Sequence, residues 1–272
     1  MTDRPRVLVT NDDGIGSEGI RQLALAVATA DVDLVVAAPA EESSGSSAAL
    51  SAVQADGRIV VDRRELDGLD ADSVFAVKAL PGFVALLASA GAFGPKPDVV
   101  ISGINRGANT GHAVLHSGTV GAALTGRTYG SRAMAVSLAM DLATSRDPSA
   151  VLHWATAARL ARLSLPLLLD GDTGYVLNLN VPNLPIDQLG GIRSARLAPF
   201  GAVQTNVVEV GEGYVQLTVA DLDPTDDPDT DAALLAAGYA TVTLLNPLCE
   251  QEPGGRPGKL AGALESAVQD EG

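Results

Sequence analysis

Residues 6–19 of this chain read Arg6-Val7-Leu8-Val9-Thr10-Asn11-Asp12-Asp13-Gly14-Ile15-Gly16-Ser17-Glu18-Gly19. The apolar run 6–10 predicts a buried strand, and the glycine-rich turn after it predicts the start of a helix. Residues 32–38 predict a second strand behind that helix. This strand-helix-strand order predicts a parallel pair joined by a right-handed crossover.

The glycines of this stretch can be interpreted in two opposite ways. Gly14, Gly16 and Gly19 match the dinucleotide fingerprint, in which backbone amides and a helix N-terminus hold a pyrophosphate. Asp12 and Asp13 lie where that anion would bind and would repel it, unless a bound cation lay between them. One interpretation is therefore an NAD-dependent oxidoreductase, with Glu41 near the position of a ribose-binding acid. The other is a metal-dependent phosphatase.

The composition of the chain limits the classes of molecule that it could bind. The chain has 272 residues and a formal net charge of −15, with 46% hydrophobic but only 3% aromatic residues. A core of Ala, Val and Leu suits helices packed closely on a parallel sheet. The acidic balance argues against a nucleic-acid polymer or an anionic membrane as a partner. Cys249 is the only cysteine, and we see neither a signal peptide nor a membrane span. We expect a soluble cytoplasmic protein.

The order of segments predicts an α/β fold, with a Rossmann-like and mostly parallel sheet flanked by helices. The expected strands cover 6–10, 32–38, 58–62, 73–77, 98–102, 133–138, 175–181 and 239–245. The expected helices cover 18–30, 82–90, 121–129, 150–169 and 230–238. Two alternating segments within 192–220 predict a C-terminal β-hairpin arm. We expect a catalytic core over 1–190, an oligomerisation arm with a returning helix and strand over 191–249, and a tail over 250–272.

Polar residues follow several predicted strands, and ligands of open α/β sheets bind at such strand ends. These segments are 11–13, 43–47, 102–109 and the turn around Ser137. Asp12 and Asp13 offer hard carboxylate oxygens, while Ser44 and Asn105 offer neutral ones. Mg²⁺ and Mn²⁺ prefer such a set. The alternative is that these residues only cap a helix, line a loop and form a turn.

A second group of residues suits an anion. The backbone amides of Gly118 and Thr119 lie at a predicted helix start, where the helix dipole favours negative charge. Asn109 precedes them, and Ser117 adjoins them. Such a site would let an acidic protein bind an acidic substrate without a basic patch. The alternative is that Ser117 acts only as the helix cap. We favour solvated roles for Arg106 and Arg127 and non-catalytic roles for His112 and His116.

Four ordered motifs resemble the SurE family of metal-dependent nucleoside monophosphate phosphatases (5′/3′-nucleotidases). They are Val9-Thr10-Asn11-Asp12-Asp13-Gly14, Ala38-Pro39 with Ser44-Gly45, Ser102-Gly103-Ile104-Asn105-x-Gly107-x-Asn109, and Ser117-Gly118-Thr119-Val120. The resemblance implies a Mg²⁺ or Mn²⁺ ion held by Asp12, Asp13, Ser44 and Asn105. It implies phosphate contacts from Asn109, Ser117, Gly118 and Thr119, with which we group Asn11. It also implies a homodimer or homotetramer that exchanges the arm at 200–220.

Two departures from the family pattern concern the substrate. Leu80-Pro81-Gly82-Phe83 and His116 stand where the family usually has other residues. We therefore expect a phosphomonoesterase acting on a nucleoside 5′/3′-monophosphate or a related specialised phosphate ester. Asp12 and Asp13 are the expected catalytic residues, and a metal-activated water and an aspartate base or nucleophile stay open as mechanisms. A catalytically silent nucleotide-binding module remains a further alternative.

Overall fold

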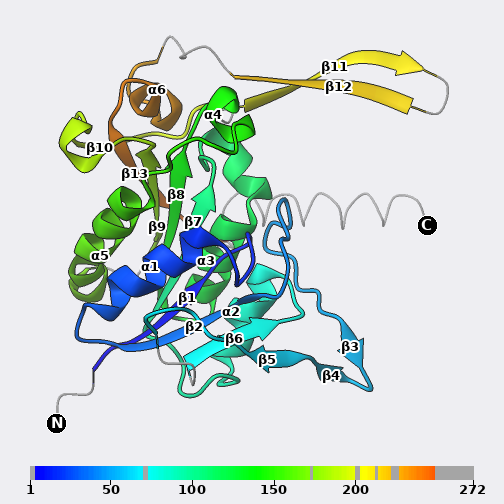
Figure 1. Cartoon of the computed structure of the whole chain (residues 1–272), viewed down its shortest axis with the longest axis vertical. Coiled ribbons are helices and arrows are strands. Elements are labelled where there is room, and N and C mark those ends of the chain that lie inside the picture. The colour runs from blue at the N-terminus through cyan, green and yellow to red at the C-terminus, as the bar shows by residue number, and fades with distance from the viewer. Residues whose placement is uncertain are drawn as a thin grey trace, which may run out of the picture.

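A computed structural model of the chain describes residues 4–69, 73–171, 174–199, 203–211, 214–221 and 227–248. Nine strands form one sheet in the spatial order β10-β13-β9-β8-β7-β1-β2-β6-β5 (Figure 1). In chain order they are β1 (Arg6–Thr10), β2 (Asp33–Pro39), β5 (Val61–Arg63), β6 (Val74–Val77), β7 (Val99–Arg106), β8 (Arg132–Ala139), β9 (Val176–Pro182), β10 (Ile192–Ser194) and β13 (Ala240–Leu245).

The remaining elements surround this sheet or project from it. The helices are α1 (Glu18–Ala28), α2 (Pro81–Ser89), α3 (Gly118–Thr128), α4 (Leu142–Arg146), α5 (Trp154–Asp170) and α6 (Asp231–Ala236), with the 3₁₀ turns η2 (Gly111–His116) and η3 (Ile186–Gln188). Two separate hairpins consist of β3 (Gln54–Ala55) with β4 (Arg58–Ile59), and of β11 (Val203–Gly211) with β12 (Tyr214–Asp221). Within the part of the chain that the structure describes, no helix is long and apolar enough to cross a bilayer.

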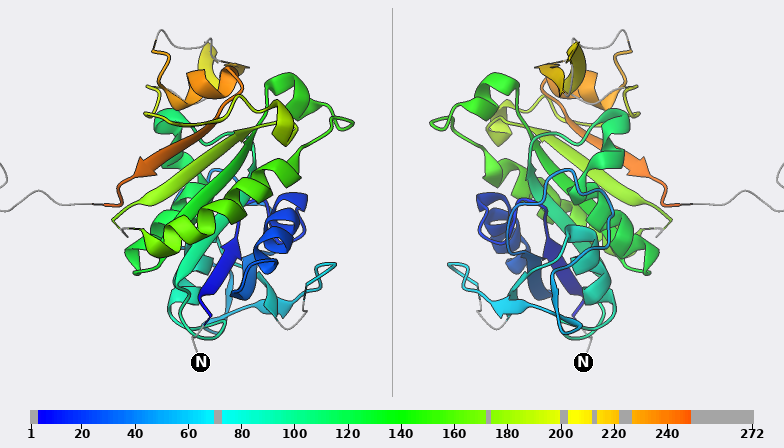
Figure 2. Two further views of the ribbon diagram at one scale, coloured as in Figure 1. Left: turned by 90° about the vertical axis from the view of Figure 1, so that its left-hand side faces the viewer. Right: turned by 90° about the vertical axis from the view of Figure 1, so that its right-hand side faces the viewer.

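Helices cover both faces of the sheet, as the two side views show (Figure 2). Helices α1 and α5 pack together on one face, and α2 and α3 on the other. Successive strand residues point to opposite faces, so Val7 and Val9 join the α1/α5 core while Leu8 joins the core beneath α2. All three side chains are fully buried, which explains why the first strand is an uninterrupted apolar run.

The strand order identifies where a ligand would bind. Strands β6, β2, β1, β7, β8 and β9 run parallel and lie side by side in that order. From β1 the chain builds outward to β2 and β6, and it then returns to the other side of β1 to form β7. The carboxyl ends of β1 and β7 therefore flank the switch point, where open α/β sheets form a binding crevice. Thr10 and Ser102 are register neighbours at those two ends.

The predicted fold class is confirmed, while several boundaries are wrong. Strand β7 continues to Arg106 instead of ending at Ser102, and its pairing with β8 shifts between Ser102 and Asn105. This irregularity lets a glycine-containing segment stay within the sheet. Helix α3 begins at Gly118 rather than 121, because Oγ of Ser117 accepts a hydrogen bond from the Val120 amide (3.0 Å). The long helix begins at Trp154 rather than 150.

The C-terminal third combines a confirmed element with a corrected one. Strands β11 and β12 form the predicted antiparallel hairpin. Residues 192–194 do not belong to it, since β10 pairs with β13 at the edge of the main sheet. The predicted strand 58–62 is divided between β4 and β5. The division into core, arm and tail stays a prediction. Glu212, Gly213, Cys249 and the tail lie outside the described residues.

Candidate active site

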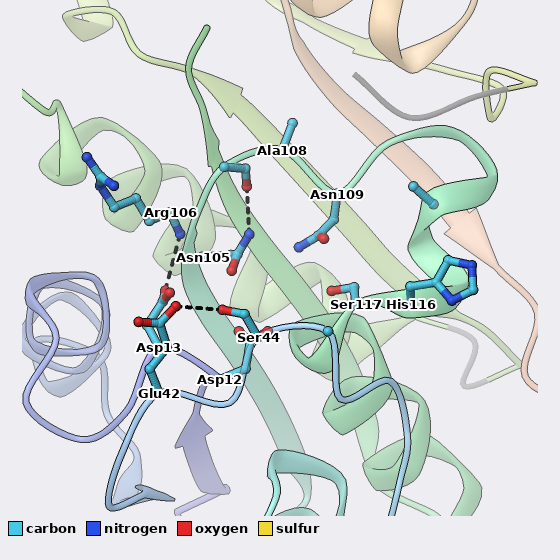
Figure 3. A pocket seen from close by; sticks show the side chains of 13 residues that line it. Asp12, Asp13, Glu42, Ser44, Asn105, Arg106, Ala108, Asn109, His116 and Ser117 are labelled. Carbon is cyan, nitrogen blue, oxygen red and sulfur yellow. Dashed lines mark hydrogen bonds between the residues drawn. The ribbon is translucent and has the colours of Figure 1, made fainter. Parts of the chain in front are cut away.

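A pocket of about 440 Å³ opens at the carboxyl ends of β1 and β7 (Figure 3). It is lined by Asp12, Asp13, Glu42, Ser44, Gly45, Asn105, Arg106, Gly107, Ala108, Asn109, Ala113, His116 and Ser117. The structure thus brings together six of the nine predicted site residues: Asp12, Asp13, Ser44, Asn105, Asn109 and Ser117. The other three, Asn11, Gly118 and Thr119, lie behind the pocket wall.

Asp12 is the deepest acid of the pocket, with 3% of its surface exposed. Burial raises the pKa of its carboxyl above the ordinary value, and hydrogen bonding from Thr119 opposes that rise. The Thr119 hydroxyl donates to Oδ1. A Cβ at Gly118 would lie 2.8 Å from Oδ2, so a side chain at this position would collide with the carboxylate. The first turn of α3 is therefore fitted to Asp12.

Asp13 is half-buried beside it. The backbone amide of Arg106 donates to its Oδ2 at 3.2 Å, which ties the β1 turn to the end of β7. Burial, the neighbouring Asp12 carboxylate and Glu42 raise the pKa of Asp13 to about 6, against the opposing Arg106 hydrogen bond. Two crowded carboxyls of this kind gain from a nearby positive charge.

The loop after β2 contributes Ser44 and an acid that we did not predict. The Ser44 hydroxyl donates to Oε1 of Glu42 at 2.8 Å, and both residues line the pocket. Glu42 is exposed, and only its position two residues before Ser44 could have signalled a role. The loop is fixed to β1, since the Ser43 amide donates to the Asp12 carbonyl at 2.8 Å.

Asn105 presents an amide oxygen to the same space. Its Nδ2 donates to the Gly107 carbonyl at 2.8 Å, which fixes the orientation of the amide group. Figure 3 shows its side-chain oxygen pointing toward the two aspartates. The irregular end of β7 thus places a neutral oxygen opposite two carboxylates.

These donors fit a hard divalent cation. Among the described residues, no group of three or more His, Cys, Asp or Glu side chains could hold a metal ion. A cation here would depend on two aspartates together with the neutral oxygens of Ser44 and Asn105. Mg²⁺ and Mn²⁺ accept few carboxylates completed by neutral oxygens and water, whereas tetrahedral zinc sites favour Cys and His. The donor set therefore fits the predicted metals.

Across the pocket, Asn109 is held by buried polar residues of β8 and β9. Its backbone amide donates to Oδ1 of Asn180 at 2.8 Å, and its side-chain Nδ2 donates to Oγ of Ser137 at 2.9 Å. Asn178 and Asn180 both donate to its carbonyl at 2.9 Å. The Asn-x-Asn pattern of β9 is the sequence signal for this support. It fixes the backbone of Asn109 where the residue enters the pocket.

The remaining predicted residues have internal or peripheral positions. Asn11 is buried, and its Nδ2 donates to the Gly14 carbonyl (3.0 Å) and to Oγ of Ser17 (2.8 Å), which braces the turn. The Arg106 guanidinium donates to the Ser145 carbonyl at 2.9 Å. His116 lines the pocket, as Arg106 does, whereas His112 and Arg127 do not.

The glycines of the opening stretch serve the turn and the packing. Gly14 has a φ of +91°, a conformation that favours glycine. A Cβ at Gly19 would lie 2.1 Å from the Ile104 carbonyl oxygen, so α1 can approach β7 only at a glycine. At Gly16 a Cβ would meet nothing within 4 Å. The fold therefore explains Gly14 and Gly19 without a bound dinucleotide, and it places no packing constraint on Gly16.

The comparisons with known proteins agree with the motifs. The family model described as Survival protein SurE matches residues 7–201. The 5′-nucleotidase SurE of Aeromonas hydrophila is 34% identical over 249 residues, covering 88% of this chain and 91% of the relative. The 5′/3′-nucleotidase SurE of Serratia proteamaculans is 36% identical over 253 residues, covering 88% and 89%. The crystal structure of SurE from Aquifex aeolicus has a TM-score of 0.73 at 26% identity, covering 89% of this chain and 93% of that one.

Proposed function

This chain belongs to the SurE family, and we propose that it is a metal-dependent phosphomonoesterase that releases phosphate from nucleoside 5′- or 3′-monophosphates or a related ester. One observation carries the proposal. The acids Asp12 and Asp13 share a pocket with Asn109 and Ser117, at the switch point of the sheet. The nucleotidase names of relatives that match most of the chain support the reaction class.

Asp12, Asp13, Ser44 and Asn105 would hold the metal, which we propose to be Mg²⁺ or Mn²⁺. The bound cation would supply positive charge against the charge that develops on the phosphoryl oxygens. The protein contributes a preorganised set of oxygens. Thr119 fixes the Asp12 carboxylate, and the Arg106 amide fixes that of Asp13. Hydrogen bonds of this kind hold the metal-binding oxygens in place before a substrate arrives.

Asn109 and Ser117 would bind the phosphoryl group from the opposite side. Ser117 is the N-cap of α3, and the positive end of the helix dipole favours a bound anion there. Gly118 and Thr119 follow in the first turn of that helix. This arrangement would offset the repulsion that the acidic chain exerts on an anion in the pocket.

One aspartate would also handle the proton or attack the phosphorus. Asp13 is the more accessible of the two acids, so it is the better placed to exchange a proton with a bound substrate or water. Asp12 is buried and bound by Thr119, which favours a fixed electrostatic role. We therefore propose Asp13 as the proton-transferring group and Asp12 as the positioning acid.

A panel assay tests this proposal. The full-length protein is incubated with Mn²⁺ or Mg²⁺ and with nucleoside 5′- and 3′-monophosphates, sugar phosphates and a chromogenic aryl phosphate, and phosphate release is measured. We expect turnover that EDTA abolishes and that added metal restores. Metal or nucleotide binding without turnover on any ester would instead support the catalytically silent module. Binding of NADH, followed by its fluorescence, would revive the oxidoreductase interpretation.

We also propose that the chain works in the cytoplasm as a homodimer or homotetramer joined through the β11–β12 arm. Figure 1 shows this hairpin projecting from the body of the molecule. A two-stranded hairpin is only marginally stable on its own in water, so a projecting one gains from a partner surface. Sedimentation of the full chain beside a variant lacking 203–221 would test this assembly.

A further inference from the structure

Asp231 is a fully buried carboxylate outside the pocket, at the first residue of α6. Its Oδ1 accepts hydrogen bonds from the backbone amides of Ala198 and Ala232, and its Oδ2 accepts one from Gly111. All three are 2.9 Å long. Burial raises the pKa of Asp231, and these donors oppose that rise. The carboxylate therefore depends on amides from three separate segments.

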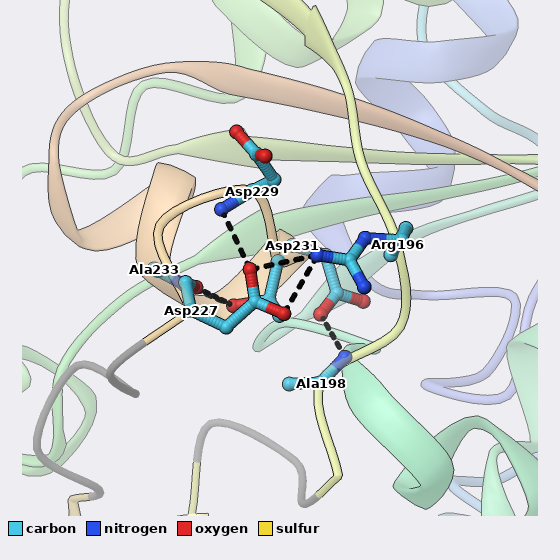
Figure 4. A network of polar contacts seen from close by, with 7 residues as sticks. Arg196, Ala198, Asp227, Asp229, Asp231 and Ala233 are labelled. Carbon is cyan, nitrogen blue, oxygen red and sulfur yellow. Dashed lines mark hydrogen bonds and ion pairs between the residues drawn. The ribbon is translucent and has the colours of Figure 1, made fainter.

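Ala198, one of these donors, and Asp231 itself lie at the base of the β11–β12 arm (Figure 4). Ala198 lies on the chain that leads into β11, and Asp231 follows the chain that returns from β12. The Arg196 guanidinium binds both carboxylate oxygens of Asp227 at 2.8 and 2.7 Å. The Asp231 amide also donates to the Arg196 carbonyl at 2.8 Å. The two ends of the arm are thus joined, with Asp231 on the inner side.

The third donor, Gly111, lies in the segment between the pocket residues Asn109 and Ser117. Gly111 is the first residue of η2, two positions after Asn109 and six before Ser117. It has a φ of +55° and is buried. Asn178 and Asn180 hold the Asn109 end of this segment, and the Asp231 bond holds its next turn. Between Gly111 and Ser117 the chain forms η2, so the Asp231 bond sets where η2 starts and where Ser117 comes to lie.

We infer that Asp231 is a positioning residue that fixes the phosphate-binding side of the pocket through the Gly111 amide. The inference rests on the phosphatase activity proposed above. Asp231 does not line the pocket, so it acts on substrate through η2 alone. It also joins the base of the arm to that segment through its bonds to Ala198 and Gly111.

The substitution Asp231→Asn should remove one of the three hydrogen bonds and keep the other two. An asparagine can accept at only one of its two terminal atoms, and its NH₂ group opposes any N–H donor that faces it. The amide oxygen will take the side where the Ala198 and Ala232 donors converge. The NH₂ group then faces the Gly111 amide, which loses its acceptor. The variant therefore releases η2 while it keeps the bonds at the arm base and in α6.

The experiment compares wild type with Asp231→Asn by hydrogen exchange, by inorganic phosphate inhibition and by Mn²⁺ titration. We expect faster exchange in 109–117 than in wild type, and unchanged exchange in the β1 and β7 peptides. The inhibition constant for phosphate and KM should each rise about tenfold, as expected for losing a hydrogen bond to a charged acceptor. The Mn²⁺ affinity should stay at its wild-type value, since Asp12 and Asp13 are untouched.

Asp227→Asn is the matched control, because it removes a carboxylate from the same arm base but no bond to Gly111. It should behave as wild type in all three measurements. The inference is overturned if Asp231→Asn leaves exchange in 109–117 unchanged, if Mn²⁺ affinity falls with phosphate affinity, or if Asp227→Asn gives the same defects. If wild type turns over no ester, the proposed function fails, and hydrogen exchange with phosphate binding still decides the role of Asp231.

Discussion

The hydroxyl of Thr119 donates a hydrogen bond to Oδ1 of Asp12 and so joins the first turn of α3 to the end of β1. One helix N-terminus thereby serves both sides of the pocket. Its buried face stabilises the acid that would hold a cation, and Ser117, its N-cap, faces the space where a phosphate would lie. Residues 117–119 therefore contribute to both sides of the pocket.

Replacing Thr119 by valine should weaken the metal side of the pocket. The change keeps the shape of the side chain but removes the donor, which leaves a buried carboxylate less well compensated. We expect the free energy of unfolding to fall by about 1.5–3 kcal/mol, together with a lower Mn²⁺ affinity. Urea unfolding and calorimetric titration measure these effects. Thr119→Ser keeps the hydroxyl and should retain most of both properties. Wild-type values for both in Thr119→Val would contradict the role of this bond.

Asp13→Asn should abolish nearly all metal-dependent phosphatase activity while the protein stays folded. The amide cannot carry the negative charge that a cation requires, and it cannot accept a proton at neutral pH. Phosphate release and circular dichroism are measured together. Asp31→Asn is the control, because Asp31 is exposed at the other end of the sheet. Substantial activity of Asp13→Asn in a metal-free assay would contradict the assignment of Asp13 to the metal site.

The crowding of two acids predicts a pH-dependent effect of metal on stability. The pKa of Asp13 rises from 3.8 to about 6 in the folded chain. Its contribution to stability is therefore fully present below 3.8 and is lost as the pH rises through about 6. Above that pH the two carboxylates repel each other, and a divalent cation would relieve the repulsion.

Saturating Mn²⁺ should accordingly raise the Tm more at about pH 7.5 than at about pH 5. Scanning calorimetry with and without the metal measures the difference, and Asp13→Asn should reduce it. An equal rise of Tm at both pH values in wild type would show that the proton and the metal do not compete at this site.

Substitutions at two glycines of the opening stretch distinguish a role in packing from a role in cofactor binding. Gly19→Ala would place a methyl group 2.1 Å from the Ile104 carbonyl oxygen, next to Asn105. We expect a loss of about 1–3 kcal/mol in unfolding free energy, as for other overpacked sites, and impaired activity. Gly16→Ala has open space and should stay within about 0.5 kcal/mol of wild type. Chemical unfolding and the phosphate assay test both. Loss of activity in Gly16→Ala with unchanged stability would point back to a ligand at this turn.

The sequence predicts the first half of the fold well, for a physical reason. Strand β1 is a buried apolar run, and α1 follows a turn that Gly14 makes possible. Parallel strands bring their carboxyl ends to one edge of the sheet, so the sequence predicts that Asp12 and Asn105 lie close together. Their neighbours Asp13 and Arg106 are hydrogen-bonded although 93 positions separate them in the chain. Composition also indicated helices packed closely on the sheet, and Gly19 against Ile104 is one such contact.

What the sequence does not predict depends on backbone geometry or on remote pairing. The Gly103-containing end of β7 resembles a loop, because its irregular pairing has no residue signature of its own. The three-residue β10 is too short to display a period. Asp231 binds three backbone amides, and amides are the same at every position except proline. No pattern of residue types could therefore have linked Asp231 to Gly111.

The position of β13 has a consequence for how the chain folds during synthesis. Strand β13 lies between β9 and β10, yet it is formed from residues 240–245. While the ribosome is still making the segment between 195 and 239, β9 has an unpaired edge and β10 has no neighbour. An open strand edge is a template for association with other chains. A product truncated before Ala240 would carry that edge permanently, so premature termination should yield aggregates rather than a shortened enzyme.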